Sequence, residues 1–348
     1  MITKFTLKLE QRNDLTYEEV CIAMDSILNG NESDENAAKF LKQLTKKSET
    51  DDELLGMLDK MQEFGLHISP QINGTIIDVC GTGGDDMETF NISTAASFVI
   101  AAAGGVVAKH GNRSVSGVCG SADIFEHFGF DLMSAPKKIT SIIEKHRIGF
   151  MFAQKFHPAM KNVAKARKIV GGRTAFNLLG PLSNPANVKN QLIGVFSEEF
   201  LDRLPLLLKR KGSQNIITVR SVDGMDEFST SSKNHICILK DGKIKSQTID
   251  GQEFGLQKSQ LSDIKITSKE EAISSFVSVL NNTANRSKIE VTALNAAAGL
   301  IVANKVDNFS DGVEIALNTI KSGQTFDLFE RFIKDCGDIQ KLEEVCKQ

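Results

Sequence analysis

The sequence has few cysteines and no long apolar run, and each shortage argues against a class of protein. The six cysteines are scattered along 348 residues, with no CxxC pair and no spacing suited to metal ligands. We therefore expect reduced thiols and a cytoplasmic protein. No segment approaches the ~18 apolar residues of a membrane-spanning helix, and the first residues lack the apolar core of a signal peptide. We expect neither secretion nor membrane insertion.

The charge balance argues against a nucleic-acid partner. With 41 basic and 44 acidic residues the net charge is −3, so binding to a polyanion would need a local basic patch. Small anionic substrates remain compatible with this balance. At ~150 residues per domain, the length predicts about two domains with a large buried core.

The first part of the chain has the pattern of short amphipathic helices. Thr16 with Glu19 and Thr50 with Glu53 form capping boxes, and Ser33 can cap a helix between them. Apolar residues at helical spacing follow each of these starts.

Beyond this segment, short apolar runs alternate with longer helical ones, which is typical of α/β architecture with a mostly parallel sheet. The expected parallel strands are Thr75–Cys80, Val106–Lys109, Phe150–Ala153, Gln191–Phe196 and Asn215–Val219. The runs His235–Lys240 and Lys243–Ile249 flank Asp241–Gly242, so we expect a hairpin that adds antiparallel strands.

These patterns predict an α/β protein of two domains. A small helical domain covers residues 1–70 and is completed by a helical segment at about 158–185. A large α/β domain covers residues 71–348, and helices close the chain from Lys269 onward.

A glycine-rich turn and a helix start together suggest an anion site. Asp78–Asp85 leaves an expected strand through the letters GTGG, where backbone N–H groups can approach phosphate oxygens. The turn lacks the lysine of a P-loop, and taken alone it is more simply a tight strand-to-helix connection. Asn91–Thr94 then opens an apolar helix, whose positive end offers hydroxyls and free N–H groups, although a plain cap would also explain it.

A third segment brings positive charge to the same edge of the sheet. Val106–Arg113 is an apolar strand that ends in Lys109, His110 and Arg113. Open α/β sheets bind ligands at the C-terminal ends of their strands. We expect Lys109 to neutralise a diphosphate, whereas a lone histidine such as His110 is more often structural than catalytic.

Two further features suggest a metal and an acceptor site. Asp226 and Glu227 are adjacent carboxylates in an expected exposed loop, and they suit Mg²⁺, although such a pair is more often solvated surface. On the expected helix from Pro158 to Val170, Arg167 borders the apolar face. An arginine there should have an anionic partner, either an internal carboxylate or a ligand.

Taken in order, these motifs resemble the anthranilate phosphoribosyltransferase family, which has a nucleoside phosphorylase-like fold. The segments that carry the resemblance are GTGGD, NIST, KHGNR and GSAD, then His157–Lys161, Arg173–Pro185 and Asp223–Glu227. The resemblance implies transfer of the 5-phosphoribosyl group of phosphoribosyl pyrophosphate (PRPP) to the amine of anthranilate, in L-tryptophan biosynthesis. It also implies a cytoplasmic homodimer formed through the helical domain.

The resemblance implies site residues as well. The residues implied to bind PRPP are Gly81, Gly84, Asp85, Thr89, Asn91, Ile92, Ser93, Thr94, Lys109, His110, Gly111, Asn112, Arg113, Ser116, Gly117 and Ser121. Those implied to contact anthranilate are Gly81, Asn112 and Arg167. Ser93, Asp226 and Glu227 are implied to hold Mg²⁺, with two ions in each active site. No residue stands out as an acid or base, and we assign none.

One loop departs from the family pattern, and two alternatives stay open. Gly117–Cys119 stands where the family has Ser-Lys-Ser, so pyrophosphate contacts would fall to the N–H groups of Gly117 and Gly120. A pyrimidine nucleoside phosphorylase-like enzyme would continue its Lys-His segment with Ser-Thr, whereas Gly111–Arg113 follows here. A non-catalytic nucleic-acid-binding relative would have a strong basic excess and eroded carboxylates.

Overall fold

The chain divides into two compact units. The computed structural model describes residues 2–85, 87–114 and 117–347. The first unit takes residues 1–67 and 153–187, and the second takes residues 68–152 and 188–348. Among the described residues no helix is long and apolar enough to cross a bilayer, and none of the six cysteines forms a disulfide.

The first unit is entirely helical. Its helices are α1 (Thr3–Glu10), α2 (Tyr17–Leu28), α3 (Asp34–Lys47), α4 (Asp51–Glu63), α8 (Ala153–Phe156), η1 (Pro158–Met160), α9 (Lys161–Val170) and α10 (Ala175–Leu182). The expected capping boxes at Thr16 and Thr50 are both present. Helix α1 was not expected, because it begins without a side-chain cap. The expected single helix from Pro158 begins with the 3₁₀ turn η1, and its α-helical part starts at Lys161.

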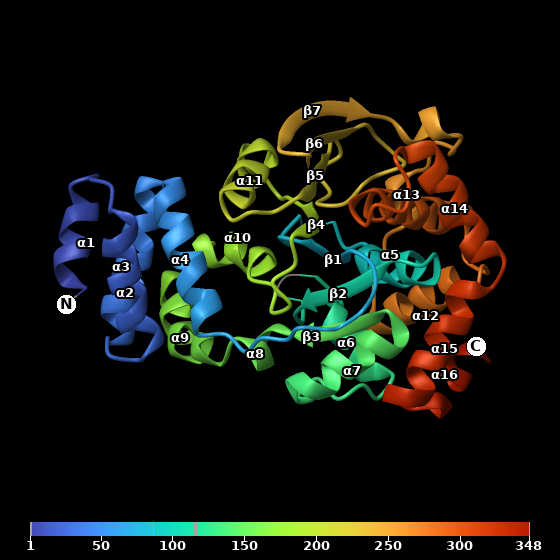
Figure 1. Cartoon of the computed structure of the whole chain (residues 1–348), viewed down its shortest axis with the longest axis horizontal. Helices are drawn as coiled ribbons and strands as arrows, with labels where there is room; N and C mark the ends of the chain where they lie inside the picture. Colours follow the sequence, from blue (N-terminus) through green and yellow to red (C-terminus); the bar gives the residue numbers. More distant parts are fainter. Residues whose placement is uncertain (1, 86, 115–116, 348) are drawn as a thin grey trace. The chain divides into compact units, whose positions relative to one another are not determined.

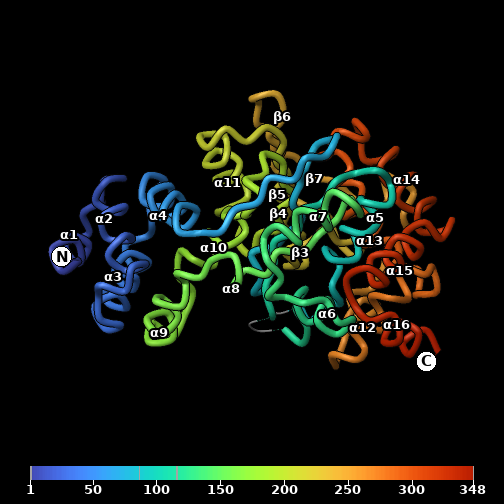
Figure 2. The backbone as a smooth tube through the Cα atoms, turned by 60° about the horizontal axis from the view of Figure 1, so that its bottom comes forward, coloured from blue at the N-terminus to red at the C-terminus, as the bar shows by residue number. Residues whose placement is uncertain are grey.

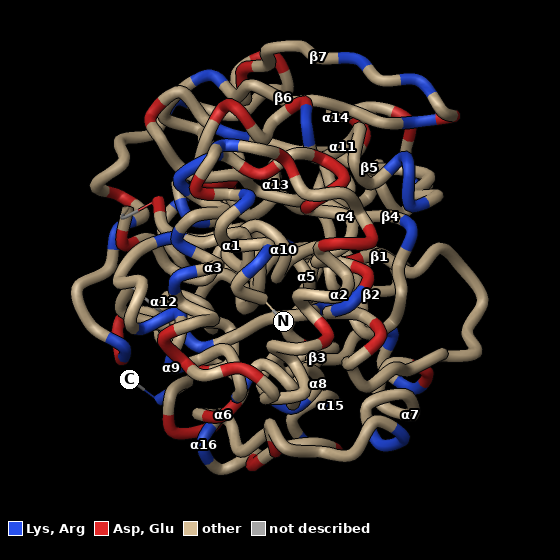
Figure 3. Tube along the Cα trace, turned by 90° about the vertical axis from the view of Figure 1, so that its left-hand side faces the viewer, with Lys and Arg blue, Asp and Glu red and all other residues tan. Residues whose placement is uncertain are grey.

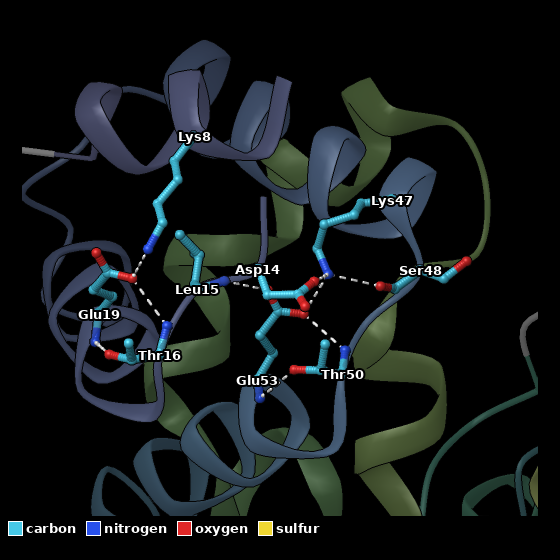
Figure 4. Close-up of polar contacts among 9 residues, drawn as sticks. All are labelled: Lys8, Asp14, Leu15, Thr16, Glu19, Lys47, Ser48, Thr50 and Glu53. Carbon is cyan, nitrogen blue, oxygen red and sulfur yellow. Dashed lines mark hydrogen bonds and ion pairs between the residues drawn. The ribbon is translucent and has the colours of Figure 1, made fainter. Parts of the chain in front are cut away.

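A buried ion pair ties three segments of the first unit together (Figure 4). The Glu53 carboxylate is 0% exposed and accepts hydrogen bonds from the N–H of Leu15 (2.8 Å) and of Thr50 (2.7 Å). Lys47 Nζ lies 2.9 Å from Glu53 and 2.7 Å from Asp14. This one carboxylate therefore joins the α1–α2 linker, the end of α3 and the start of α4.

The second unit is built on a seven-stranded sheet in the order β3-β2-β1-β4-β5-β6-β7. The strands are β1 (Ile76–Gly81), β2 (Val106–Gly111), β3 (Ile148–Phe152), β4 (Asn190–Gly194), β5 (Asn215–Ser221), β6 (Asn234–Lys240) and β7 (Lys243–Ile249). Strands β1 to β5 pair in parallel, and β5, β6 and β7 pair antiparallel. The expected hairpin is confirmed, since Asp241 and Gly242 both have positive φ between β6 and β7.

Helices cover the sheet of the second unit. They are α5 (Ile92–Ala102), α6 (Ser121–His127), α7 (Pro136–His146), α11 (Glu199–Arg210), α12 (Lys269–Leu280), α13 (Arg286–Val302), α14 (Phe309–Lys321), α15 (Gln324–Cys336) and α16 (Ile339–Cys346). Helix α5 packs on β1, β2 and α13, while α11 packs on β5 and β6 (Figure 1). The C-terminal helices α15 and α16 pack on α12 (Figure 2).

The core of the second unit centres on α5, which is mostly apolar and buried along almost its whole length. Phe98, on this helix, is fully buried and contacts the rings of Phe125, Phe276, Phe329 and Phe332 at centroid distances of 5.0–6.1 Å. An apolar helix of this kind is stable only when neighbours surround it. Helix α5 is therefore held firmly, and so is its N-terminus.

The strand order creates a switch point beside β1. From β1 the chain builds β2 and β3 on one side, and it then crosses to β4 on the other side. The loops that leave β1 and β4 therefore diverge at the C-terminal ends of these two strands. Open α/β sheets bind ligands at this position.

Two matched substitutions test the buried ion pair. Glu53 and Glu19 both close capping boxes, but the Glu53 carboxylate is 0% exposed and the Glu19 carboxylate is 29% exposed. Glu53→Ala leaves Lys47 buried without one partner, so we expect it to lower the free energy of unfolding by about 3–5 kcal/mol. Glu19→Ala should cost about 1 kcal/mol. Denaturant unfolding followed by circular dichroism measures both, and equal losses would contradict this role of Glu53.

Candidate active site

The glycine-rich turn after β1 is tied to two other segments. Gly83 and Gly84 have φ of +68° and +81°, a conformation that favours glycine. The N–H of Thr82 donates to the carbonyl of Gly194 at the end of β4 (2.9 Å). The N–H of Gly83 donates to Asp226 Oδ2 (2.7 Å). The turn, the end of β4 and the loop after β5 thus form one structure.

Glycines at two paired strand ends let the chain of Asp226 pass very close to the sheet. Gly81 of β1 pairs with Gly194 of β4. A Cβ on Gly81 would lie 2.6 Å from Asp226 Oδ2, and one on Gly194 would lie 1.4 Å from the Asp226 carbonyl oxygen. Any side chain at Gly194 would therefore push the loop that carries Asp226 away from the sheet.

The N-terminus of α5 faces the same loop. The N–H of Ser93 donates to Glu227 Oε1 (3.2 Å), so a carboxylate lies at the positive end of the helix. Asn91 donates through Nδ2 to the carbonyl of Cys119 (3.0 Å). Within the described part of the chain, the buried Asn91 Oδ1 and Thr94 Oγ1 have no hydrogen-bond partner. A bound ligand or an ordered water would satisfy such buried polar atoms.

The cationic end of β2 is buried. Lys109 is 2% exposed, and its Nζ donates to the carbonyl of Val79 (2.6 Å) and to Ser93 Oγ (3.3 Å). Burial lowers the pKa of Lys109. The N–H of His110 donates to the buried Asp78 (3.1 Å). Lys109 therefore reaches the start of α5.

Neither carboxylate of the acidic pair is fully exposed, and the expectation that the pair would be exposed was wrong for Asp226. Asp226 is 8% exposed, and Glu227 is partly buried. Burial, with the nearby Asp85, raises the pKa of Asp226 to about 7. Burial, with the adjacent Asp226, raises the pKa of Glu227 to about 8. The cause is the close approach at Gly81 and Gly194, which no local sequence pattern reveals.

These residues fit a divalent cation. Carboxylate and hydroxyl oxygens are the donors that Mg²⁺ prefers, and the raised pKa values show that nearby negative charge and burial oppose ionisation. Over the described ranges no group of three or more His, Cys, Asp or Glu side chains could hold a metal. Asp226, Glu227 and the Ser93 hydroxyl would thus supply part of a coordination shell, and substrate oxygens or waters would complete it.

The loop after β2 brings further predicted residues to this edge. Ser121 Oγ donates to the carbonyl of Asn112 (3.3 Å), while Asn112 and Gly117 are exposed. The Arg113 guanidinium bonds Glu126 (2.6 and 2.7 Å) and Asp123 (2.9 Å), and these hydrogen bonds raise its pKa. Its role at a phosphate therefore stays a prediction.

Thr89 and Ser116 are two further residues of the predicted PRPP site. Thr89 is partly buried and forms an isolated bridge with Lys265. Ser116 lies outside the described residues, together with Val115.

Arg167 lies in the first unit, on α9. Its guanidinium packs over the ring of Phe176 (5.6 Å to the centroid) and bonds Asn177 Oδ1 at 3.4 Å. Within the described ranges no carboxylate pairs with it, so the internal salt bridge is not observed. Burial lowers its pKa. A half-buried cation without an anion is suited to an anionic ligand.

Sequence reasoning missed several residues that shape the site. One of them is Gly194, which lies against the main chain of Asp226. The other two are Asn234 and Asn295, which bond the residues just after the acidic pair. Asn295 was detectable only as a single amide within the apolar run of α13, and its partner lies far away in the sequence.

Two family descriptions match the chain. Residues 3–65 match a glycosyl transferase family helical bundle domain, and residues 73–326 match a glycosyl transferase family a/b domain. The chain is 66% identical over 345 residues to an anthranilate phosphoribosyltransferase of Nitrosopumilus maritimus, covering 99% of each. It is 47% identical over 337 residues to the one of Cenarchaeum symbiosum, covering 97% of this chain and 98% of the relative.

Solved structures agree with these matches. The anthranilate phosphoribosyltransferase of Thermus thermophilus is 34% identical, with a TM-score of 0.88 over 94% of this chain and 98% of that one. The Saccharomyces cerevisiae enzyme in complex with PRPP and Mg shares the fold at 24% identity, with a TM-score of 0.86 over 96% of this chain and 97% of that one.

Burial of the acidic pair predicts a pH dependence in the metal-free protein. The raised pKa values of Asp226 (about 7) and Glu227 (about 8) exceed the ~4 of an unfolded carboxyl. The folded state therefore holds protons that the unfolded state releases, and this contribution to stability is lost as pH rises from ~4 through both folded values. A doubly neutralised variant, Asp226→Asn with Glu227→Gln, should show a flatter dependence. Thermal melting in EDTA between pH ~4 and ~8 measures the pH dependence of stability for both proteins. If the two melting temperatures change with pH in parallel, the raised pKa values of the acidic pair are contradicted.

Proposed function

Because the chain belongs to the anthranilate phosphoribosyltransferase family, we propose that it transfers the 5-phosphoribosyl group of PRPP to the amine of anthranilate. The products are N-(5-phosphoribosyl)anthranilate and pyrophosphate, and the reaction is a step of L-tryptophan biosynthesis. The observation that carries this proposal is the convergence of a glycine turn, a helix N-terminus and a buried acidic pair at the switch point beside β1. Full-length relatives named for this activity support it.

We assign the diphosphate of PRPP to the glycine turn and the start of α5. Gly83 and Gly84 carry no side chain that would block an approaching phosphate, and the positive end of the helix suits phosphate oxygens. The unpartnered Thr94 Oγ1 and Asn91 Oδ1 support a polar ligand here. The other residues proposed to contact PRPP are those that the family resemblance implies, with Arg113 dependent on release from Glu126.

Mg²⁺ is the proposed cofactor, with two ions in each site. Asp226, Glu227 and Ser93 would hold it, and when bound it would neutralise charge on the departing diphosphate. Lys109 is close enough to Ser93 to orient the hydroxyl and to add a fixed positive charge beneath the site. No described residue is assigned as a general base.

Anthranilate recognition is assigned to Arg167, Asn112 and Gly81. The planar guanidinium of Arg167 can bind a carboxylate through two hydrogen bonds, and the Phe176 ring limits its movement. The remaining catalytic requirement is alignment of the aryl amine with the anomeric carbon, which positioning alone can supply.

The alternatives are less well supported. A nucleoside phosphorylase-like enzyme would bind free phosphate through Ser-Thr after the Lys-His segment, and this chain has Gly111–Arg113 there. A nucleic-acid-binding relative would concentrate basic residues, but basic and acidic residues are interspersed along the chain (Figure 3) and the net charge is −3.

We further propose a cytoplasmic homodimer formed through the first unit. Leu7, Tyr17 and Ile22 on α1 and α2 are 37–52% exposed, and these apolar side chains suit a second copy of the same surface. Six cysteines without disulfides suit a reducing compartment.

An assay with PRPP, Mg²⁺ and anthranilate tests the proposed reaction and the role of Arg167 together. We expect loss of anthranilate fluorescence that requires both PRPP and Mg²⁺. Arg167→Ala should raise the KM for anthranilate by roughly 30-fold or more, because removing one member of a buried charge pair costs about 2–5 kcal/mol. The KM for PRPP should stay within about twofold. Arg167→Lys should restore only part of the affinity, since it loses the two-bond geometry.

The matched control is Lys168→Ala, which removes an exposed cation from the adjacent position of α9. It should change neither KM. If Arg167→Ala melts several degrees lower with both KM values unchanged, Arg167 is structural, and Asn112 becomes the first candidate for the acceptor site.

A further inference from the structure

The main chain that follows Glu227 is held by two buried side-chain amides. Asn295 of α13 accepts from the N–H of Phe228 (3.1 Å) and donates to its carbonyl (2.9 Å). Asn234, at the start of β6, accepts from the N–H of Ser229 (2.7 Å) and donates to its carbonyl (2.9 Å). Both asparagines are 0% exposed. Each amide thus bonds both the N–H and the carbonyl of one residue.

This arrangement replaces a strand partner in a segment that has none. Phe228 and Ser229 lie between β5 and β6 and belong to neither strand. An amide carries an acceptor and a donor side by side, as a peptide group does, so it can pair with a lone backbone residue. Asn295 uses its remaining donor on the Val291 carbonyl of its own helix (2.9 Å).

A buried asparagine at position 295 destabilises the fold unless its side-chain amide makes hydrogen bonds. The surrounding residues of α13, from Val291 to Val302, are buried and almost all apolar. A buried amide in such a helix is tolerated only when its hydrogen bonds are made. A leucine would pack there without that requirement, and the bonds to Phe228 are the feature a leucine could not supply.

Hydrogen bonds also hold the same loop just before the acidic pair. Asp223 accepts hydrogen bonds from the hydroxyl of Ser229 (2.7 Å) and from those of Ser221 and Ser231. The Phe228 ring is fully buried against Phe309, with 5.6 Å between centroids. The main chain of Asp226 and Glu227 therefore lies between two segments that buried side chains hold in place.

We propose that Asn295 and Asn234 are positioning residues that hold Asp226 and Glu227 in the geometry needed to bind the divalent cation. This inference rests on the proposed function. The two amides bond the main chain at residues 228–229, so they would act on the acidic pair through that main chain.

The test is Asn295→Asp, which keeps the volume but puts an acceptor against the carbonyls of Phe228 and Val291. Binding of Mn²⁺ in the presence of pyrophosphate, followed by electron paramagnetic resonance, requires no turnover. We expect affinity to fall about tenfold or more, the usual size of outer-shell effects. The Mg²⁺ concentration for half-maximal rate should rise in parallel, while the KM for anthranilate stays within about twofold.

Asn190→Asp is the matched control, because this buried amide lies at the start of β4, the opposite end of the strand from Gly194. It should lower stability and leave Mn²⁺ binding unchanged. If Asn295→Asp is insoluble, Asn234→Ser makes the same test from the other side of the loop.

Three outcomes are distinct. The proposal is supported if Mn²⁺ binding weakens in the Asn295 or Asn234 variant and stays unchanged in Asn190→Asp. Unchanged binding in a folded variant overturns it and leaves the proposed reaction intact. Wild-type protein that binds no Mn²⁺ with pyrophosphate and consumes no anthranilate overturns the proposed function and this inference with it.

Discussion

The candidate site depends on one close approach, in which the main chain at Asp226 crosses the ends of two neighbouring strands. Gly81 and Gly194 lie opposite each other, and a Cβ on either would collide with Asp226. Because both positions lack a side chain, the loop after β5 can lie directly against the sheet. The same contact buries Asp226 and brings Glu227 to the N-terminus of α5.

This close approach lowers the stability of the metal-free protein at the place where it forms the candidate site. Burial and mutual repulsion oppose ionisation of the acidic pair, so the metal-free site is under electrostatic strain. Several hydrogen bonds keep the loop in place despite that strain, including the one from the Gly83 N–H to Asp226 and the two between Phe228 and Asn295. Local rules of protein structure are often broken in this way at functional sites, with compensation elsewhere.

Much of the fold could be predicted from the sequence because its signals are local. Every strand was expected to within two residues at either end, and the hairpin followed from Asp241–Gly242. The capping boxes at Thr16 and Thr50 fixed two helix starts. Helix α1 lacked such a cap and was missed.

The candidate site was predicted in composition but not in geometry. Its glycine turn, helix start and acidic pair are short motifs, whereas burial of Asp226 depends on Gly194, 32 positions earlier in the chain. The amide of Asn295 likewise bonds a residue 67 positions away in the sequence. Periodicity and motif spacing carry no information on such contacts.

The proposed role of the pair Asp226–Glu227 is to hold the cation that binds the diphosphate. Anomalous diffraction from crystals soaked with Mn²⁺ and PRPP is the direct test of this role. We expect a manganese peak about 2.1 Å from carboxylate oxygens of this pair, with the diphosphate against the start of α5. A manganese peak bound to the diphosphate but remote from both carboxylates would contradict it.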